Sequence, residues 1–107
     1  MHAYSASKGG LQGLVRVLAA DLADEGVRVN AVLPGITETP MNAWWTEDPA
    51  ARADVVRAVP LGRPAAPEEI AAVVAFLVSD DAAYLTGSSI LVDGGWLADG
   101  GWEHPPP

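Results

Sequence analysis

Two side chains near the start of the chain have the types and spacing of a proton-transfer pair. Tyr4 and Lys8 lie four residues apart in the run MHAYSASKGG, and Lys8 is the only lysine of the 107 residues. On a helix, that spacing puts the phenol and the ammonium on the same face. A nearby cation favours the phenolate, so it lowers the pKa of a tyrosine and lets it donate and accept protons. Ordinary surface pairs share this spacing, so the pair alone does not separate a catalytic role from a structural one.

Hydrophobic spacing predicts the helix that would carry this pair. Residues 5–25 are expected to be helical, because apolar side chains recur at three- and four-residue steps and form a stripe. The stripe consists of Leu11, Leu14, Val15, Leu18 and Leu22. Gly26 is expected to end the helix. Residues 27–33 are apolar and rich in β-branched side chains, which favours a buried parallel strand that ends at Pro34-Gly35.

The next part of the chain is predicted to be helical. Residues 41–58 should form one or two short helices, either over a pocket or as a plain amphipathic connector. Trp44 and Trp45 in that stretch either line a substrate pocket or pack. Pro67 has the character of a first helical residue, with two glutamates in the favourable first turn. The buried face of that helix is predicted to be Ile70, Val73, Val74 and Leu77.

A second strand and a turn are predicted near the end. Residues 88–92 form the strand, and Asp93 begins the Asp-Gly-Gly turn after it, where shaping the turn is favoured over catalysis. The segment 97–107, with a glycine pair and three terminal prolines, is predicted to be a poorly ordered tail.

Composition limits the partners that the chain can have. Fourteen acidic residues against six Lys and Arg give a net charge of −8, which argues against nucleic-acid and anionic-membrane binding. There is no cysteine, and His2 and His104 have no metal-ligand spacing, so no metal site is expected. No apolar run approaches a membrane span, and no signal peptide precedes Tyr4, so a cytoplasmic setting is expected.

A series of segments, in this order and at this spacing, resembles the C-terminal half of short-chain dehydrogenases/reductases. The segments read YSASKGGL, VRVNAVLPGITETPM, PLGRPAAPEEIA, FLVSDDAAYLTG and ILVDGG. The resemblance covers the chain from Tyr4 to Gly95. It implies an α/β fold in which residues 1–96 are the C-terminal part of a Rossmann-like domain with a doubly wound parallel sheet. The chain would be a fragment of that domain, with about two strands and several helices.

The resemblance also implies roles for individual residues. Tyr4 matches the tyrosine whose hydroxyl gives or takes the alcohol or carbonyl proton. Lys8 matches the lysine that lowers the pKa of that tyrosine and binds the nicotinamide ribose. Thr39 matches a hydroxyl near the carboxamide or a phosphate, and Pro40 departs from many relatives. The loop whose backbone meets the carboxamide matches Pro34, Gly35, Ile36 and Thr37. Ser5 and Ser7 are interpreted as polar groups of the helix start rather than as the family's catalytic serine.

Other parts of the family's machinery lie upstream of its tyrosine. They are the Gly-rich turn that holds the pyrophosphate, the catalytic serine and a helix asparagine, and no such Gly-rich turn occurs in this sequence. The chain is therefore expected to be a fragment, through a mis-called start, a truncated gene or a partial product. NAD and NADP both stay open, because the residue that reads the ribose 2′ position lies in the missing half.

The function implied by the resemblance is an NAD(P)-dependent oxidoreductase. It would pass a hydride between nicotinamide and a small-molecule carbonyl or secondary alcohol, in a dimer or tetramer, and this fragment would be inactive alone. The alternative is a non-enzymatic truncated module that associates with full-length subunits of the family.

Overall fold

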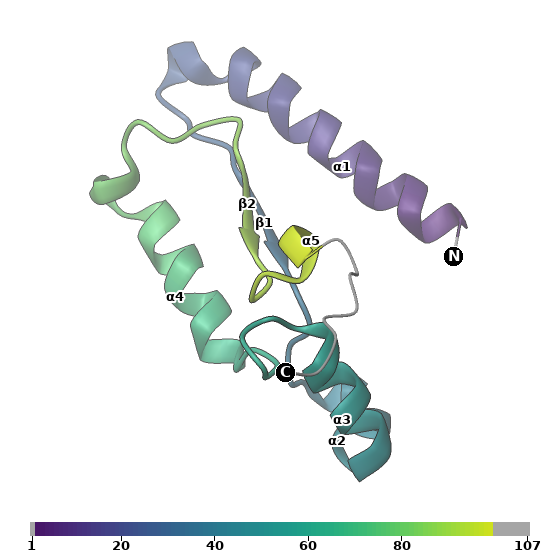
Figure 1. Cartoon of the computed structure of the whole chain (residues 1–107). Helices are drawn as coiled ribbons and strands as arrows, with labels where there is room; N and C mark the ends of the chain where they lie inside the picture. The colour runs from purple at the N-terminus through teal and green to yellow at the C-terminus, as the bar shows by residue number, and fades with distance from the viewer. Residues whose placement is uncertain (1, 100–107) are drawn as a thin grey trace. The chain divides into compact units, whose positions relative to one another are not determined.

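The computed structural model describes residues 2–99, with the backbone alone at residue 99. Two strands, β1 (Ala31–Pro34) and β2 (Ser89–Val92), are accompanied by helices (Figure 1). The α-helices are α1 (His2–Asp21), α2 (Ala43–Thr46), α3 (Pro49–Ala58), α4 (Pro67–Val78) and α5 (Trp96–Asp99). Short 3-10 helices are η1 (Ala23–Glu25), η2 (Pro40–Asn42) and η3 (Asp80–Ala82).

The two strands pair in parallel, which confirms the predicted α/β class. Ala31 N donates to Ser88 O at 2.8 Å and Gly35 N donates to Val92 O at 2.9 Å, so the two strands run in the same direction. The predicted first strand, residues 27–33, is wrong at its start, because the regular ladder begins at Ala31. The reason is a long-range contact: Val29 N donates to the Thr86 hydroxyl instead of a backbone carbonyl.

The described residues divide into two compact units. One comprises residues 2–33 and 73–90, and the other comprises residues 34–72 and 91–99.

In the first unit, Arg28 links the strand region to the end of α4. Its guanidinium donates to the carbonyl oxygens of Leu77 at 2.8 Å, Leu85 at 3.1 Å and Ser79 at 3.3 Å. The side chain of Asn30 donates to Leu85 O and accepts from Ser88 N. These side chains satisfy carbonyls at and beyond the helix end, where no intrahelical donor exists.

The helix predicted over residues 5–25 is present as α1 followed by η1, but it begins earlier than predicted, at His2, so Tyr4 also lies in it. Gly26 ends it in the left-handed region at φ 73°, with its N–H bonded to Ala23 O. The expected apolar stripe is only partly buried: Val15 is buried and Leu22 half-buried, whereas Leu11 and Leu14 are each 51% exposed. Only part of the stripe therefore finds cover within the described residues.

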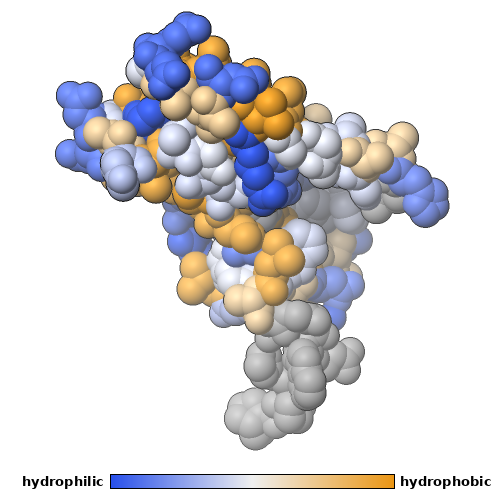
Figure 2. Space-filling model, turned by 90° about the horizontal axis from the view of Figure 1, so that it is seen from above, coloured by the Kyte–Doolittle hydropathy of each residue, from blue (hydrophilic) through white to orange (hydrophobic). Residues whose placement is uncertain are grey.

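Many other apolar side chains are exposed, and Figure 2 shows such side chains in orange on the face that it draws. On α4, Leu77 is buried as predicted and Val73 is half-buried, but Val74 is exposed. The prediction for Val74 is therefore wrong. The apolar surface of this helix is therefore larger than the other described residues cover.

The segment predicted as one or two short helices, residues 41–58, contains α2 and α3, and α4 begins at the predicted Pro67. Pro49 is the first residue of α3, and Asp48 caps it by accepting from Ala50 N at 2.9 Å. Pro67 is the first residue of α4. Proline suits this position because it has no N–H to leave unpaired. The predicted tail from Leu97 overlaps α5, and residues 100–107 lie outside the described residues.

Candidate active site

The predicted proton-transfer pair lies on one exposed face of α1. Lys8 Nζ is 5.4 Å from the centroid of the Tyr4 ring, a cation–π distance. Tyr4 is 64% exposed, so its hydroxyl is open to an external group. Ser7 Oγ donates to Tyr4 O at 2.7 Å, which is a helix-internal bond and agrees with the structural interpretation of that serine. The helix thus brings Tyr4 and Lys8 together as their spacing predicts.

The predicted cofactor loop follows β1 in the second unit. Gly35 packs so tightly on the turn after β2 that a Cβ built on it would lie 2.6 Å from Asp93 Cα. Thr37 Oγ1 donates to Gly35 O at 3.1 Å, and Thr37 O accepts from Asn42 Nδ2 at 2.7 Å. Thr39 has an extended backbone before η2, which Pro40 begins. The loop from Pro34 to Thr39 is therefore held in one shape by its own bonds and by Asn42.

Asp93 shapes the turn after β2, as predicted. Its Oδ1 accepts from Gly95 N and its Oδ2 accepts from Leu97 N, each at 3.0 Å. Gly94 and Gly95 both have positive φ, at 64° and 89°. Because both carboxylate oxygens serve backbone donors at the start of α5, they hold the turn rather than act as a base.

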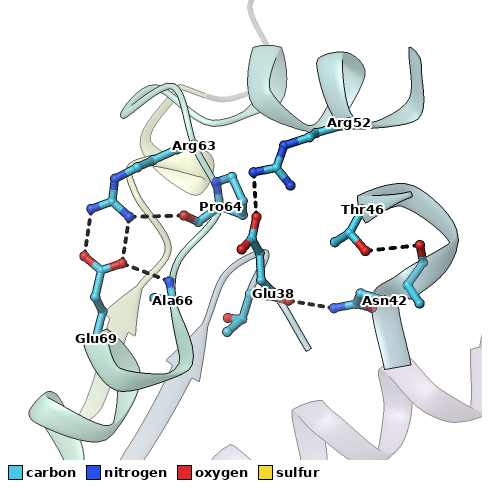
Figure 3. Close-up of polar contacts among 10 residues, drawn as sticks. Glu38, Asn42, Thr46, Arg52, Arg63, Pro64, Ala66 and Glu69 are labelled. Carbon is cyan, nitrogen blue, oxygen red and sulfur yellow. Dashed lines mark hydrogen bonds and ion pairs between the residues drawn. The ribbon is translucent and has the colours of Figure 1, made fainter. Parts of the chain in front are cut away.

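An ion pair at the start of α4 was not predicted. Arg63 donates to both carboxylate oxygens of Glu69, at 2.6 and 2.7 Å (Figure 3). Glu69 Oε2 also accepts from Ala66 N at 2.9 Å. The hydrogen bond from Arg63, followed by that from Ala66, lowers the pKa of Glu69 from 4.5 to about 2. A glutamate three residues into a helix is a capping signal, but nothing in the sequence identifies Arg63 as its partner.

A second unpredicted ion pair connects the loop after β1 to α3. Arg52 Nη2 lies 2.7 Å from Glu38 Oε1, fourteen positions earlier in the chain (Figure 3).

The two tryptophans of α2 differ in burial: Trp45 is 2% exposed, whereas Trp44 is 70% exposed. Trp45 is therefore a packing residue, and Trp44 remains available to a ligand.

A cavity of about 450 Å³ lies within the second unit. Ile36 of the predicted loop lines it, with Arg63 and Glu69 at its polar side and Val59–Leu61 and Leu91–Gly95 as its other walls.

Within residues 2–99 no cluster of three metal-ligating side chains occurs. Over the same residues, no helix has the length and apolarity needed to cross a bilayer.

Comparison with known proteins places these features in a family. The profile of the family described as enoyl-(acyl carrier protein) reductase matches residues 1–97. The chain is 47% identical over 100 residues to 3β-hydroxysteroid dehydrogenase 1 of Eggerthella lenta, covering 94% of this chain and 38% of that protein. It is 46% identical over 95 residues to cyclohexanol dehydrogenase of an Acinetobacter species, covering 89% and 36%.

Solved structures agree with the sequence relatives. 4-Hydroxyisoleucine dehydrogenase complexed with NADH superposes with a TM-score of 0.86 at 32% identity, covering 91% of this chain and 40% of that one. A putative 2-deoxy-D-gluconate 3-dehydrogenase from Agrobacterium tumefaciens with bound NADP gives 0.83 at 40% identity, covering 89% and 39%. The chain spans well under half the length of each protein named here. It belongs to the short-chain dehydrogenase/reductase family, and its fold is a part of that family's Rossmann fold.

Proposed function

We propose that this chain is the C-terminal part of an NAD(P)-dependent oxidoreductase that interconverts a secondary alcohol and a carbonyl compound. The observation that carries the proposal is the Tyr4–Lys8 pair. Its two side chains share one face of α1, at 5.4 Å from ammonium to ring centroid, in a chain of the dehydrogenase family. An exposed phenol beside a cation is suited to passing a proton to and from a substrate oxygen.

The residues present fit a nicotinamide cofactor. Lys8 is exposed, and the ion pairs found among residues 2–99 do not engage it, so its three N–H donors are available to ribose hydroxyls. The loop Pro34–Thr37 would supply backbone groups for the carboxamide, and the Thr39 hydroxyl would approach the carboxamide or a phosphate. The structural relatives with NADH and with NADP support both forms of the cofactor for the complete protein. When bound, the nicotinamide supplies or accepts the hydride.

The chain's own residues would move the proton and hold the geometry. Tyr4 Oη would give its proton to the carbonyl oxygen during reduction and take it back during oxidation. Lys8 would hold the ribose. Because the chain covers 38% of its Eggerthella relative, the pyrophosphate site would lie in a further segment, and the isolated chain should be inactive.

A second candidate function rests on the exposed apolar side chains of α1. Leu11, Leu14 and Val17 are all at least half exposed, which suits a protein–protein interface. The chain would then be a non-enzymatic module that pairs with longer subunits of the family. In the oxidoreductase, the same face would be covered by the rest of the domain or by a second subunit.

The test uses an N-terminally extended protein. This chain is joined to the segment encoded upstream of it or to the N-terminal portion of the Eggerthella lenta relative. Oxidation of cyclohexanol and of a 3β-hydroxysteroid is followed by the appearance of NADH or NADPH. Tyr4→Phe keeps the ring but loses the proton carrier, so kcat should fall about 100-fold or more. Tyr84→Phe is the matched control, because Tyr84 is fully exposed and is the other tyrosine of the chain. Near-normal turnover by Tyr4→Phe would refute the assignment.

A further inference from the structure

Residues 39–64 form an excursion that is closed at its base within the second unit. Thr37 and Ala65 make an isolated parallel bridge. In it, Ala65 N donates to Ile36 O and Glu38 N donates to Ala65 O, both at 2.9 Å. The helices η2, α2 and α3 lie between these two ends. Backbone bonds therefore fix the base of the excursion, while its far part depends on other contacts for its position.

One ion pair runs from the far part of the excursion back to its base. Arg52 of α3 lies 2.7 Å from Glu38, which is adjacent to the bridge (Figure 3). The other ion pairs among residues 2–99 do not make this connection: Arg57–Asp54 is internal to α3, and Arg63–Glu69 stands at the start of α4. Arg52 is thus the charged link between α3 and the loop after β1.

One oxygen of the Glu38 carboxylate, Oε1, is buried, although the side chain as a whole is partly exposed. Within the described residues, Arg52 Nη2 at 2.7 Å is the group that compensates the charge of this oxygen. Removing the cation would leave a buried oxygen uncompensated, which disfavours the closed arrangement more than the loss of a fully exposed pair would. Both side chains are otherwise about two-fifths exposed, at 41% for Glu38 and 43% for Arg52, so water and salt moderate the effect.

We propose that Arg52 is a positioning residue for substrate binding. Its ion pair with Glu38 holds α3, and α2 packed on α3, against the Pro34–Thr39 loop. The α2 helix presents Trp44 to solvent while Trp45 anchors it from within. Holding α3 therefore fixes where Trp44 stands relative to the loop. The substrate part of this inference rests on the proposed function, since the loop is the proposed contact of the nicotinamide.

Hydrogen exchange on the ligand-free, N-terminally extended protein tests the positioning without any need for activity. Arg52→Gln should speed exchange of the α2 and α3 amides by about two- to fivefold, the range expected for one half-exposed ion pair. Arg57→Gln makes the same charge change but breaks only the exposed Arg57–Asp54 pair inside α3, so the α2 amides should keep their wild-type rates. Arg52→Lys, which keeps the charge, should restore most of the protection. Equal exchange in Arg52→Gln and wild type would overturn the proposal.

Steady-state kinetics with the alcohol that the protein oxidises tests the substrate part. Arg52→Gln should raise the KM for that alcohol about two- to fivefold while kcat stays within about twofold, because proton transfer does not pass through Arg52. An unchanged KM together with faster exchange would overturn the substrate role. Faster exchange in a protein that oxidises no alcohol would uphold the positioning of α3 by Arg52 and would count against the proposed function instead.

Discussion

Replacing Arg28 by methionine should destabilise the domain substantially. The guanidinium donates to three carbonyls at and after the end of α4, two of them at 2.8 and 3.1 Å and the third at a weaker 3.3 Å. A hydrogen bond from a charged donor contributes about 1.5–3 kcal/mol, and we take the lower end for the two shorter bonds because the side chain is half-buried. The expected loss is about 3 kcal/mol, since methionine keeps the apolar stem but none of the donors.

The measurement is urea unfolding and thermal unfolding of the N-terminally extended protein. A loss of about 3 kcal/mol corresponds to a fall in Tm of roughly 6–12 °C for a domain of this family's size. Arg28→Lys should retain about half of the free energy that Arg28 contributes to folding. One compact ammonium cannot reach all the carbonyls that the planar guanidinium reaches.

Arg16→Met is the control, since Arg16 lies exposed on α1 and should change the free energy of unfolding by less than about 0.5 kcal/mol. If Arg28→Met unfolds within that same small margin of wild type, the three carbonyls do not depend on Arg28 and the reasoning fails.

Three further predictions concern pH and the isolated chain. The pKa of Glu69 is lowered from 4.5 to about 2 in the fold, so Glu69 contributes stability above pH 4.5 that is lost as the pH falls toward about 2. The stability gap between wild type and Glu69→Gln should close over that range, whereas Glu68→Gln, its neighbour in the same helical turn, should show no such closing. The 107-residue chain by itself should self-associate, because Leu11, Leu14 and Val17 are exposed, and a compact monomer in size-exclusion chromatography with sharp near-UV circular dichroism would contradict this. Micromolar binding of NADH by that chain in calorimetry would contradict the proposal that the pyrophosphate site lies elsewhere.

The sequence predicted the elements whose causes are local. The helix over α1 follows from apolar spacing and the glycine at its end, and α4 follows from Pro67 at its first position. Asp93 was assigned to a turn, and both its oxygens do hold that turn. The strand predicted at 27–33 starts later, at Ala31, because a hydroxyl fifty-seven positions away takes the N–H of Val29. A window of neighbouring residues contains no sign of such a partner.

The sequence by itself determined the candidate chemistry: a helix of 3.6 residues per turn places Tyr4 and Lys8 on one face whatever the rest of the chain does. Tertiary structure alone decided which apolar residues are covered, so that Val15 is buried while Leu14 on the same stripe is not. It also separated Trp45 from Trp44 and paired Arg52 with Glu38. The physical reason is that backbone geometry is set within a few residues, whereas burial and ion pairing depend on which distant segments approach.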